Sequence, residues 1–211
     1  MKNFLVKFSV IVAILFFIRP VSANVSLVVL GDSLSAGYAM AQSESWVGIL
    51  QQRWATTHPD ITLINASISG DTTQGALNRL QGVIDRHQPT AVFVELGGND
   101  GLRGFVPASI QDNLLQIIDK LQQTGAQVAL SQVRIPPNYG ARYSDMFAEI
   151  FPATAKQADI PLIPFFMETI IENEDLMQND GIHPNRSAQP LIADIMEPYM
   201  LQMARGELQK N

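Results

Sequence analysis

The chain alternates short runs of apolar residues with longer stretches in which apolar residues recur every three or four positions. A short, nearly continuous run of valine, isoleucine and leucine is typical of a strand that is buried on both faces of a parallel sheet. Five runs predict such strands: Val25–Leu30, Ile61–Ile64, Ala91–Leu96, Gln127–Leu130 and Pro161–Ile163.

The stretches between these runs have helical spacing. The clearest is Pro107–Gln123, in which the apolar residues form a single stripe and Gly125 marks the end of the helix. Further helices are predicted at Trp46–Thr57, Thr73–His87, Arg142–Ala158 and near Ser187–Ala204. This alternation predicts an α/β fold with three α/β/α layers and a doubly wound, mostly parallel five-stranded sheet. Periodicity does not determine the strand order, and we expect the flavodoxin-like order.

The first residues have the features of a signal peptide. Lys2 and Lys7 are positively charged, Phe8–Ile18 is apolar except for Ser9, and Val21–Ala23 consists of small residues. The apolar run is shorter than the ~20 residues that a membrane-spanning helix needs. We therefore predict a signal peptide over residues 1–23 and one domain over 24–211, with an uncleaved anchor as the alternative.

Composition narrows the location and the chemistry. A formal net charge of −6 and the lack of a basic face argue against nucleic acid as a partner. The chain has no cysteine, which excludes disulfides, a thiol nucleophile and a thiolate metal site. We expect a periplasmic monomer that needs no metal or organic cofactor, with full secretion as the alternative location.

The first predicted strand ends at a candidate nucleophile. Ser33 follows Gly31 and Asp32 on a tight turn between a strand and the next helix. A serine hydroxyl on such a turn is exposed, and its own backbone N–H can face a developing oxyanion. The alternative is that Asp32 or Ser33 only caps the next helix.

A serine nucleophile needs a base, and the chain has three histidines. His58 lies in a polar turn and His87 ends a helical stretch, so both are interpreted as structural. His183 follows Asp180 by three residues with a glycine between them, so the aspartate can fold back and accept from Nδ1. Nε2 is then left to accept the serine proton. The alternative is an Asx-turn with an incidental histidine.

Glycine-rich segments after the second and third predicted strands offer oxyanion donors. Gly70 can present an unobstructed backbone N–H, and Asn99 can present its side-chain amide. Alternatively, Gly70 eases a loop and Asp71 or Thr72 caps the next helix. Such turns also bind phosphates, but the chain has neither a dinucleotide-binding nor a P-loop motif, which excludes a nucleotide site.

Together, these segments resemble the hallmark blocks of the SGNH, or GDSL, hydrolase family. The matching blocks are Gly31-Asp32-Ser33-Leu34, Gly70, Gly97-Gly98-Asn99-Asp100 and Asp180-Gly181-Ile182-His183-Pro184. The resemblance implies that Ser33, Asp180 and His183 form a catalytic triad. It also implies that the Ser33 backbone N–H, Gly70 and the Asn99 side chain together form the oxyanion hole. The mature chain is similar throughout to the periplasmic thioesterase and lysophospholipase branch of the family. This similarity implies an enzyme that cleaves fatty acyl thioesters, lysophospholipids and simple esters.

Two segments are candidate walls for the acyl group. Gly101–Val106 is a partly apolar loop beyond Asn99, and Ile135 follows the fourth strand, so we expect Gly101, Leu102, Phe105 and Ile135 to contact substrate. The alternative is ordinary loop packing. Two other functions stay open: a carbohydrate O-acetyl esterase, and a non-catalytic module that binds lipid or glycan.

Overall fold

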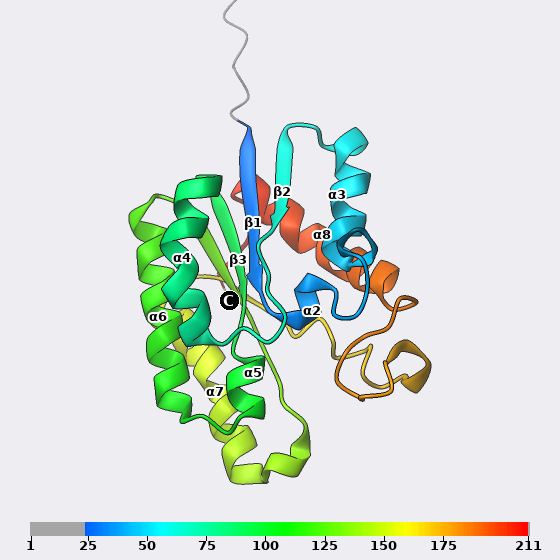
Figure 1. The fold of residues 1–211 in the computed structure, drawn as a ribbon. Helices are drawn as coiled ribbons and strands as arrows, with labels where there is room; N and C mark the ends of the chain where they lie inside the picture. The colour runs from blue at the N-terminus through cyan, green and yellow to red at the C-terminus, as the bar shows by residue number, and fades with distance from the viewer. Residues whose placement is uncertain (1–23, 211) are drawn as a thin grey trace, which may run out of the picture.

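The computed structural model describes residues 24–210, which form a five-stranded parallel sheet (Figure 1). The strands are β1 (Val25–Gly31), β2 (Ile61–Asn65), β3 (Ala91–Glu95), β4 (Gln127–Ser131) and β5 (Leu162–Ile163). The spatial order is β2-β1-β3-β4-β5, and every neighbouring pair is parallel. This is the flavodoxin-like order that was expected.

Helices cover both faces of the sheet, which confirms the predicted three layers (Figure 1). One face is packed by α4 (Thr73–His87), α6 (Pro107–Gln123) and α7 (Ala141–Ala158). The other is packed by α3 (Trp46–Thr57) and α8 (Gln189–Arg205). Successive side chains of a strand point to opposite faces, so Val28 and Leu30 enter the first core, while Leu27 and Val29 enter the second.

The predicted bounds of α3, α4 and α6 agree with the structure, and the other predicted elements differ by one or two residues at their ends. Two short helices had no predicted bounds: α2 (Ser33–Ala36) and α5 (Gly98–Leu102). Gly101–Val106 was expected to be a loop, but its first two residues belong to α5. Four or five residues are too few to show helical periodicity in a sequence.

The carboxyl ends of the strands gather the loops that carry the predicted chemistry. In Figure 1 the strands run downward, and α2 and α5 lie near their lower ends. Ligands of such sheets bind at this edge. The predicted signal peptide, residues 1–23, lies outside the described residues. Within residues 24–210, no helix combines the length and the apolar character that crossing a membrane requires.

Candidate active site

Ser33 is the first residue of α2, immediately after β1. Ser33 is 9% exposed. The preceding Asp32 caps the helix, because its Oδ1 accepts a hydrogen bond of 3.1 Å from the backbone N–H of Leu34. The capping interpretation of this turn is therefore correct for Asp32. It leaves the Ser33 hydroxyl available to another element.

That element is the loop that carries Asp180 and His183. The Ser33 Oγ lies 2.8 Å from Nε2 of His183, and Nδ1 of the same ring lies 2.7 Å from Oδ2 of Asp180. The other oxygen of Asp180 accepts from the backbone N–H groups of Ile182 and His183, at 2.9 and 3.0 Å. The Asx-turn and the triad geometry therefore occur together.

The carboxylate of Asp180 is held in its charged form. Partial burial raises its pKa, but hydrogen bonds from the backbone and the ring of His183 and from the Ile182 N–H outweigh this effect. The result is a pKa lowered from 3.8 to about 2. A charged acceptor at Nδ1 fixes the tautomer in which Nε2 can accept a proton.

Tyr38 covers the outer face of the imidazole. Its ring stacks on that of His183 with a centroid distance of 4.2 Å and an angle of 27° between the planes. The Tyr38 carbonyl accepts from Nε2 of Gln178, in the loop that leads to His183. Sequence reasoning missed this residue, because nothing in a tyrosine five positions after Ser33 indicates which ring it will meet.

Asn99, on α5, and Gly70, on the loop after β2, lie at the same edge of the sheet. Nδ2 of Asn99 donates to Oδ2 of Asp32 at 3.1 Å, and this amide nitrogen has a second hydrogen that can be donated to a substrate. Gly70 has a φ of +81°, in the left-handed region that favours glycine. Its loop is joined to the end of β1, because the N–H of Ile68 donates to the Gly31 carbonyl at 3.1 Å.

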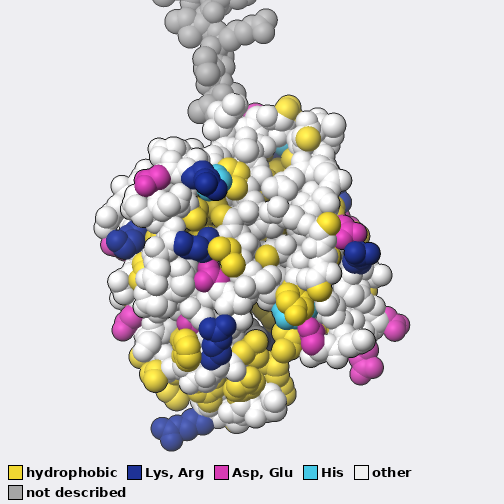
Figure 2. Space-filling model, viewed as in Figure 1, with side chains coloured by type: hydrophobic (Ala, Val, Ile, Leu, Met, Phe, Trp, Pro, Cys, Tyr) yellow, Lys and Arg dark blue, Asp and Glu magenta, His cyan; other side chains and the backbone are white. Residues whose placement is uncertain are grey.

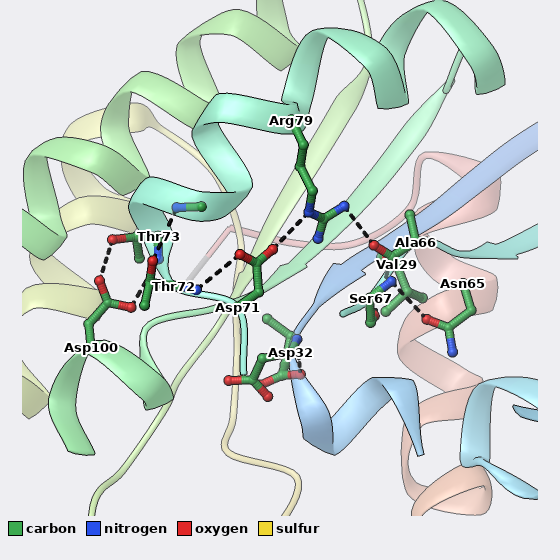
Figure 3. Close-up of polar contacts among 12 residues, drawn as sticks. Val29, Asp32, Asn65, Ala66, Ser67, Asp71, Thr72, Thr73, Arg79 and Asp100 are labelled. Carbon is green, nitrogen blue, oxygen red and sulfur yellow. Dashed lines mark hydrogen bonds and ion pairs between the residues drawn. The ribbon is translucent and has the colours of Figure 1, made fainter. Parts of the chain in front are cut away.

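An ion pair holds the Gly70 loop to α4 (Figure 3). Arg79 donates from Nε to Asp71 at 2.7 Å and from Nη1 to the Ala66 carbonyl at 2.8 Å. The hydroxyl of Thr72 caps α4 through the N–H of Gly75, so this capping interpretation is also correct. The loop is therefore fixed on both sides of Gly70.

Asp100 links α5 to the start of α4, as Figure 3 also shows. Its carboxylate accepts from the backbone N–H of Thr73 at 2.9 Å and from the Thr73 hydroxyl at 2.6 Å. The helix that carries Asn99 is thus tied to the helix that follows the Gly70 loop.

A buried acid, Glu95, lies beneath the turn that carries Asp32 and Ser33, here called the nucleophile turn. Its Oε2 accepts from the Ser35 hydroxyl at 2.8 Å and from the Asp32 N–H at 3.4 Å. A Cβ on Gly31 would lie 2.8 Å from the same oxygen, which explains the glycine at the end of β1. Sequence reasoning missed Glu95, although an acid within an otherwise apolar run is a usable signal.

Burial raises the pKa of both Asp32 and Glu95. Desolvation raises the pKa of Asp32 to about 6, although hydrogen bonds from Leu34 and Asn99 act in the opposite direction. Desolvation and the charge of Asp32 raise the pKa of Glu95 well above its usual value. These acids therefore favour their neutral forms more than solvent-exposed carboxyl groups do.

A cavity of about 450 Å³ opens beside the Ser33 hydroxyl. Ser33, Asn99 and His183 line it, whereas Gly70 is not among its lining residues. Figure 2 shows a hollow flanked by histidine and hydrophobic side chains. The apolar lining consists of Leu34, Leu102, Val133, Ile135, Pro136, Pro137, Phe165, Met167, Ile171 and Ile182.

The predicted acyl-contact residues separate into two pairs. Leu102 and Ile135 line the cavity. Gly101 and Phe105 are not among the lining residues. A Cβ on Gly101 would lie within 2.7 Å of the Phe147 and Ile135 side chains, so this glycine permits close packing behind the cavity wall. Phe105 lies on the surface, 44% exposed.

The site contains proton-transfer groups and hydrogen-bond donors. Within residues 24–210, no group of three or more histidine, aspartate or glutamate side chains is arranged to hold a metal ion. The arrangement present suits a nucleophilic attack by Ser33 with His183 as its base.

Comparison with known proteins agrees with this geometry. Residues 29–189 match the model of the GDSL-like lipase/acylhydrolase family. The chain is 49% identical over 183 residues to the thioesterase 1/protease 1/lysophospholipase L1 of Escherichia coli strain K12, covering 87% of this chain and 86% of the relative. It is 47% identical over 185 residues to an arylesterase of Vibrio mimicus, covering 87% and 92% of the two chains.

Solved structures show the same relationship. The esterase EstA from a Pseudoalteromonas species, inhibited by monoethylphosphonate, superposes with a TM-score of 0.83 at 46% identity, covering 86% of this chain and 99% of that chain. AlinE4, an SGNH-hydrolase esterase, superposes with a TM-score of 0.70 at 35% identity, covering 85% and 96%. The chain therefore belongs to the GDSL-like lipase/acylhydrolase family and is an esterase of that family.

Proposed function

We propose that the protein hydrolyses acyl esters and thioesters through an acyl-enzyme formed on Ser33. The observation that carries this proposal is the continuous hydrogen-bonded line from Ser33 Oγ through the His183 ring to Asp180, with contacts of 2.8 and 2.7 Å. A hydroxyl, an imidazole and a carboxylate in this order form an activated nucleophile.

The reaction has two halves. His183 Nε2 takes the Ser33 proton as Oγ attacks the acyl carbonyl, and the developing oxyanion accepts hydrogen bonds from the N–H groups of Ser33 and Gly70 and from Asn99. His183 then gives the proton to the leaving alcohol or thiol. Water, deprotonated by the same imidazole, attacks the acyl-enzyme, and the Ser33 oxygen recovers its proton as the acid leaves.

The apolar cavity favours a lipid-like acyl group. Leu102 and Ile135 form its wall in this proposal, Gly101 allows the wall to pack closely, and Phe105 extends the acyl contact outward. We propose fatty acyl thioesters, lysophospholipids and simple aryl or alkyl esters as substrates, in agreement with the names of the relatives. Each buried methylene contributes ~0.8 kcal/mol, so chain-length preference rises by about fourfold per carbon at most.

The proposed setting is the periplasm. The sequence features of residues 1–23 support export, and an acidic chain without cysteine suits a monomer that acts there without cofactor or nucleic acid. Among the proposed substrates, a lysophospholipid is the ester that this compartment supplies most readily. Recovery of the protein in the osmotic-shock fluid supports this location, whereas retention in the cytosol contradicts it.

A chain-length series with a covalent label tests the proposal. The purified protein and its Ser33→Ala variant are assayed on acetyl, octanoyl and palmitoyl esters and treated with a fluorophosphonate. Ser43→Ala is the matched control, since Ser43 is exposed and outside the site. We expect octanoyl and palmitoyl turnover, with the label on the Ser33 peptide. Turnover that falls sharply beyond acetyl favours the O-acetyl esterase. An active Ser33→Ala variant contradicts the mechanism.

A further inference from the structure

Exposed apolar side chains are unevenly distributed over the described surface. Eight large hydrophobic residues are exposed in residues 24–210. Four of them surround the catalytic cavity or the loops beside it: Tyr38, Ile68, Ile171 and Ile182. Three others, Phe105, Val106 and Met146, lie on two segments that Tyr143 joins, and this group needs an explanation because monomeric proteins rarely expose large apolar patches without a function.

These three residues and two tyrosines form one surface, here called the apolar patch: Phe105, Val106, Tyr139, Tyr143 and Met146. The tyrosine hydroxyls point inward, because Tyr143 donates to the Phe105 carbonyl at 2.7 Å and Tyr139 to the Leu102 carbonyl at 2.8 Å. Figure 2 shows hydrophobic side chains gathered at the lower end of the molecule, over α5 and the start of α7.

One exposed arginine, Arg142, borders the patch, and so does one exposed acid, Asp145. The other two arginines between residues 101 and 144 already have partners: Arg134 pairs with Glu168 at 2.7 Å, and Arg103 donates to the Gly70 carbonyl at 3.1 Å. Arg142 is exposed and lines the same open hollow as Tyr139 and Met146. Within the described residues Arg142 forms no ion pair, so its charge is available to an anion outside the protein.

The patch is continuous with the wall of the catalytic cavity. Leu102 lines the cavity, and its carbonyl accepts from Tyr139 of the patch. Pro137 also lines the cavity and begins the short 3-10 helix that ends at Tyr139. Leu102 and Pro137 therefore connect the edge of the patch to the cavity wall.

We propose that the apolar patch docks the enzyme on a lipid surface that carries anionic headgroups, and so delivers long-chain substrates to the cavity. The inference rests on the proposed function for its substrate class. A lipid surface fits the three observations together: it takes up Val106 and Met146, it pairs with Arg142, and it is the place where long-chain acyl esters are found. The net charge of the chain would repel such a surface on its other sides.

Co-sedimentation with vesicles tests the docking without any need for catalysis. The purified Ser33→Ala protein is mixed with vesicles of phosphatidylcholine, with or without phosphatidylglycerol. We expect binding to the mixed vesicles that weakens with salt. The variant Val106→Ser/Met146→Gln should bind severalfold more weakly to both kinds of vesicle. Its matched control is Leu191→Gln, since Leu191 is 45% exposed on α8, which covers the other face of the sheet.

The double variant should fold normally. Val106 is the N-cap of α6, a position with no side-chain cap in this structure, and serine is a preferred N-cap residue. Glutamine at position 146 keeps helix propensity on an exposed face of α7. A soluble acetyl ester, assayed on the same variant with Ser33 restored, should be hydrolysed at the wild-type rate, while turnover of a palmitoyl ester embedded in vesicles should fall severalfold.

A charge variant separates the two parts of the surface. Arg142→Gln should lower affinity for the phosphatidylglycerol vesicles about fivefold, the loss expected from ~1 kcal/mol per basic residue near an anionic surface, and leave the neutral vesicles unaffected. Arg86→Gln is the control, since Arg86 is exposed at the far end of α4.

Three results overturn the docking. The protein can stay in the supernatant with both vesicles, or Leu191→Gln can weaken binding as much as the double variant does. The protein can also form a dimer that the double variant dissociates, without any vesicle binding, which assigns the patch to a second copy of the chain. Failure of the proposed function is a different outcome, because vesicle binding is measured on an inactive variant.

Discussion

Removing the guanidinium of Arg79 should loosen the loop that carries Gly70. Arg79 is 23% exposed and its partner Asp71 is 10% exposed, and the arginine also donates to the Ala66 carbonyl at 2.8 Å. Arg79→Met keeps the aliphatic packing and leaves Asp71 largely buried without its cation. Breaking a buried pair costs about 3–5 kcal/mol, but water still reaches part of this pair, so we expect a loss of about 2–3 kcal/mol.

Urea unfolding measures this loss, and Arg86→Met on the same helix is the matched control because its side chain is exposed and outside the site. A double-mutant cycle with Asp71→Asn isolates the pairwise contribution. We also expect kcat on a short soluble ester to fall at least tenfold with little change in KM, since complete loss of an oxyanion donor costs about 2.7–4 kcal/mol. Equal urea midpoints for Arg79→Met and Arg86→Met, or an unchanged kcat, would refute the reasoning.

Gly70→Ala should lower the free energy of unfolding by urea by about 1–2 kcal/mol, because alanine is strained at a φ of +81°. The new Cβ meets no atom within 4 Å, so backbone strain is the only cost expected. An unchanged urea midpoint contradicts this prediction. Tyr38→Ala should lower kcat/KM about two- to fivefold by removing the ring that stacks on the imidazolium, while Tyr38→Phe should not; equal losses contradict a stacking role. Ile135→Ala should reduce the ratio of palmitoyl to butyryl ester turnover, and an unchanged ratio contradicts the cavity wall. The pKa of Asp180 is lowered to about 2, so the stability that its charged carboxylate contributes should be present above pH 4 and lost from about pH 4 to 2. The difference in unfolding free energy between the wild type and Asp180→Asn should shrink over that range. A constant difference contradicts this prediction.

The layers of the fold were predictable because burial on both faces leaves a strong pattern. β3 has five consecutive buried residues, and the apolar stripe of α6 gives the same bounds in the sequence and in the structure. The alignment of Asp180 with His183 was predictable for a different reason. Two of the three histidines lay in local settings that explained them, which left His183 as the candidate partner for Ser33.

The supports of the site were not predictable, because their partners come from other elements. Tyr38 contacts a ring 145 positions later in the chain, and its spacing from Ser33 carries no periodic signal. Arg79 occupies an ordinary polar position of an amphipathic helix until Asp71 and Ala66 are placed beside it. Gly101 was expected to lie in a loop, but it is a helical residue on which a Cβ would collide with Phe147.

The carboxyl edge of the sheet is held together by polar contacts to two acids, Asp32 and Glu95, whose burial costs stability. Asp32 joins β1 to Asn99 of α5, and Glu95 of β3 accepts from Ser35 and from Asp32, so the nucleophile turn is fixed from two neighbouring elements. Because the pKa of Asp32 is raised from 3.8 to about 6, its ionisation weakens the folded state as the pH rises from about 4 to 6. A fold selected only for stability would place apolar side chains here. The acids are explained by what they hold in place: Glu95 accepts from Asp32 and Ser35, which lie on either side of Ser33, and Asp32 accepts from Asn99.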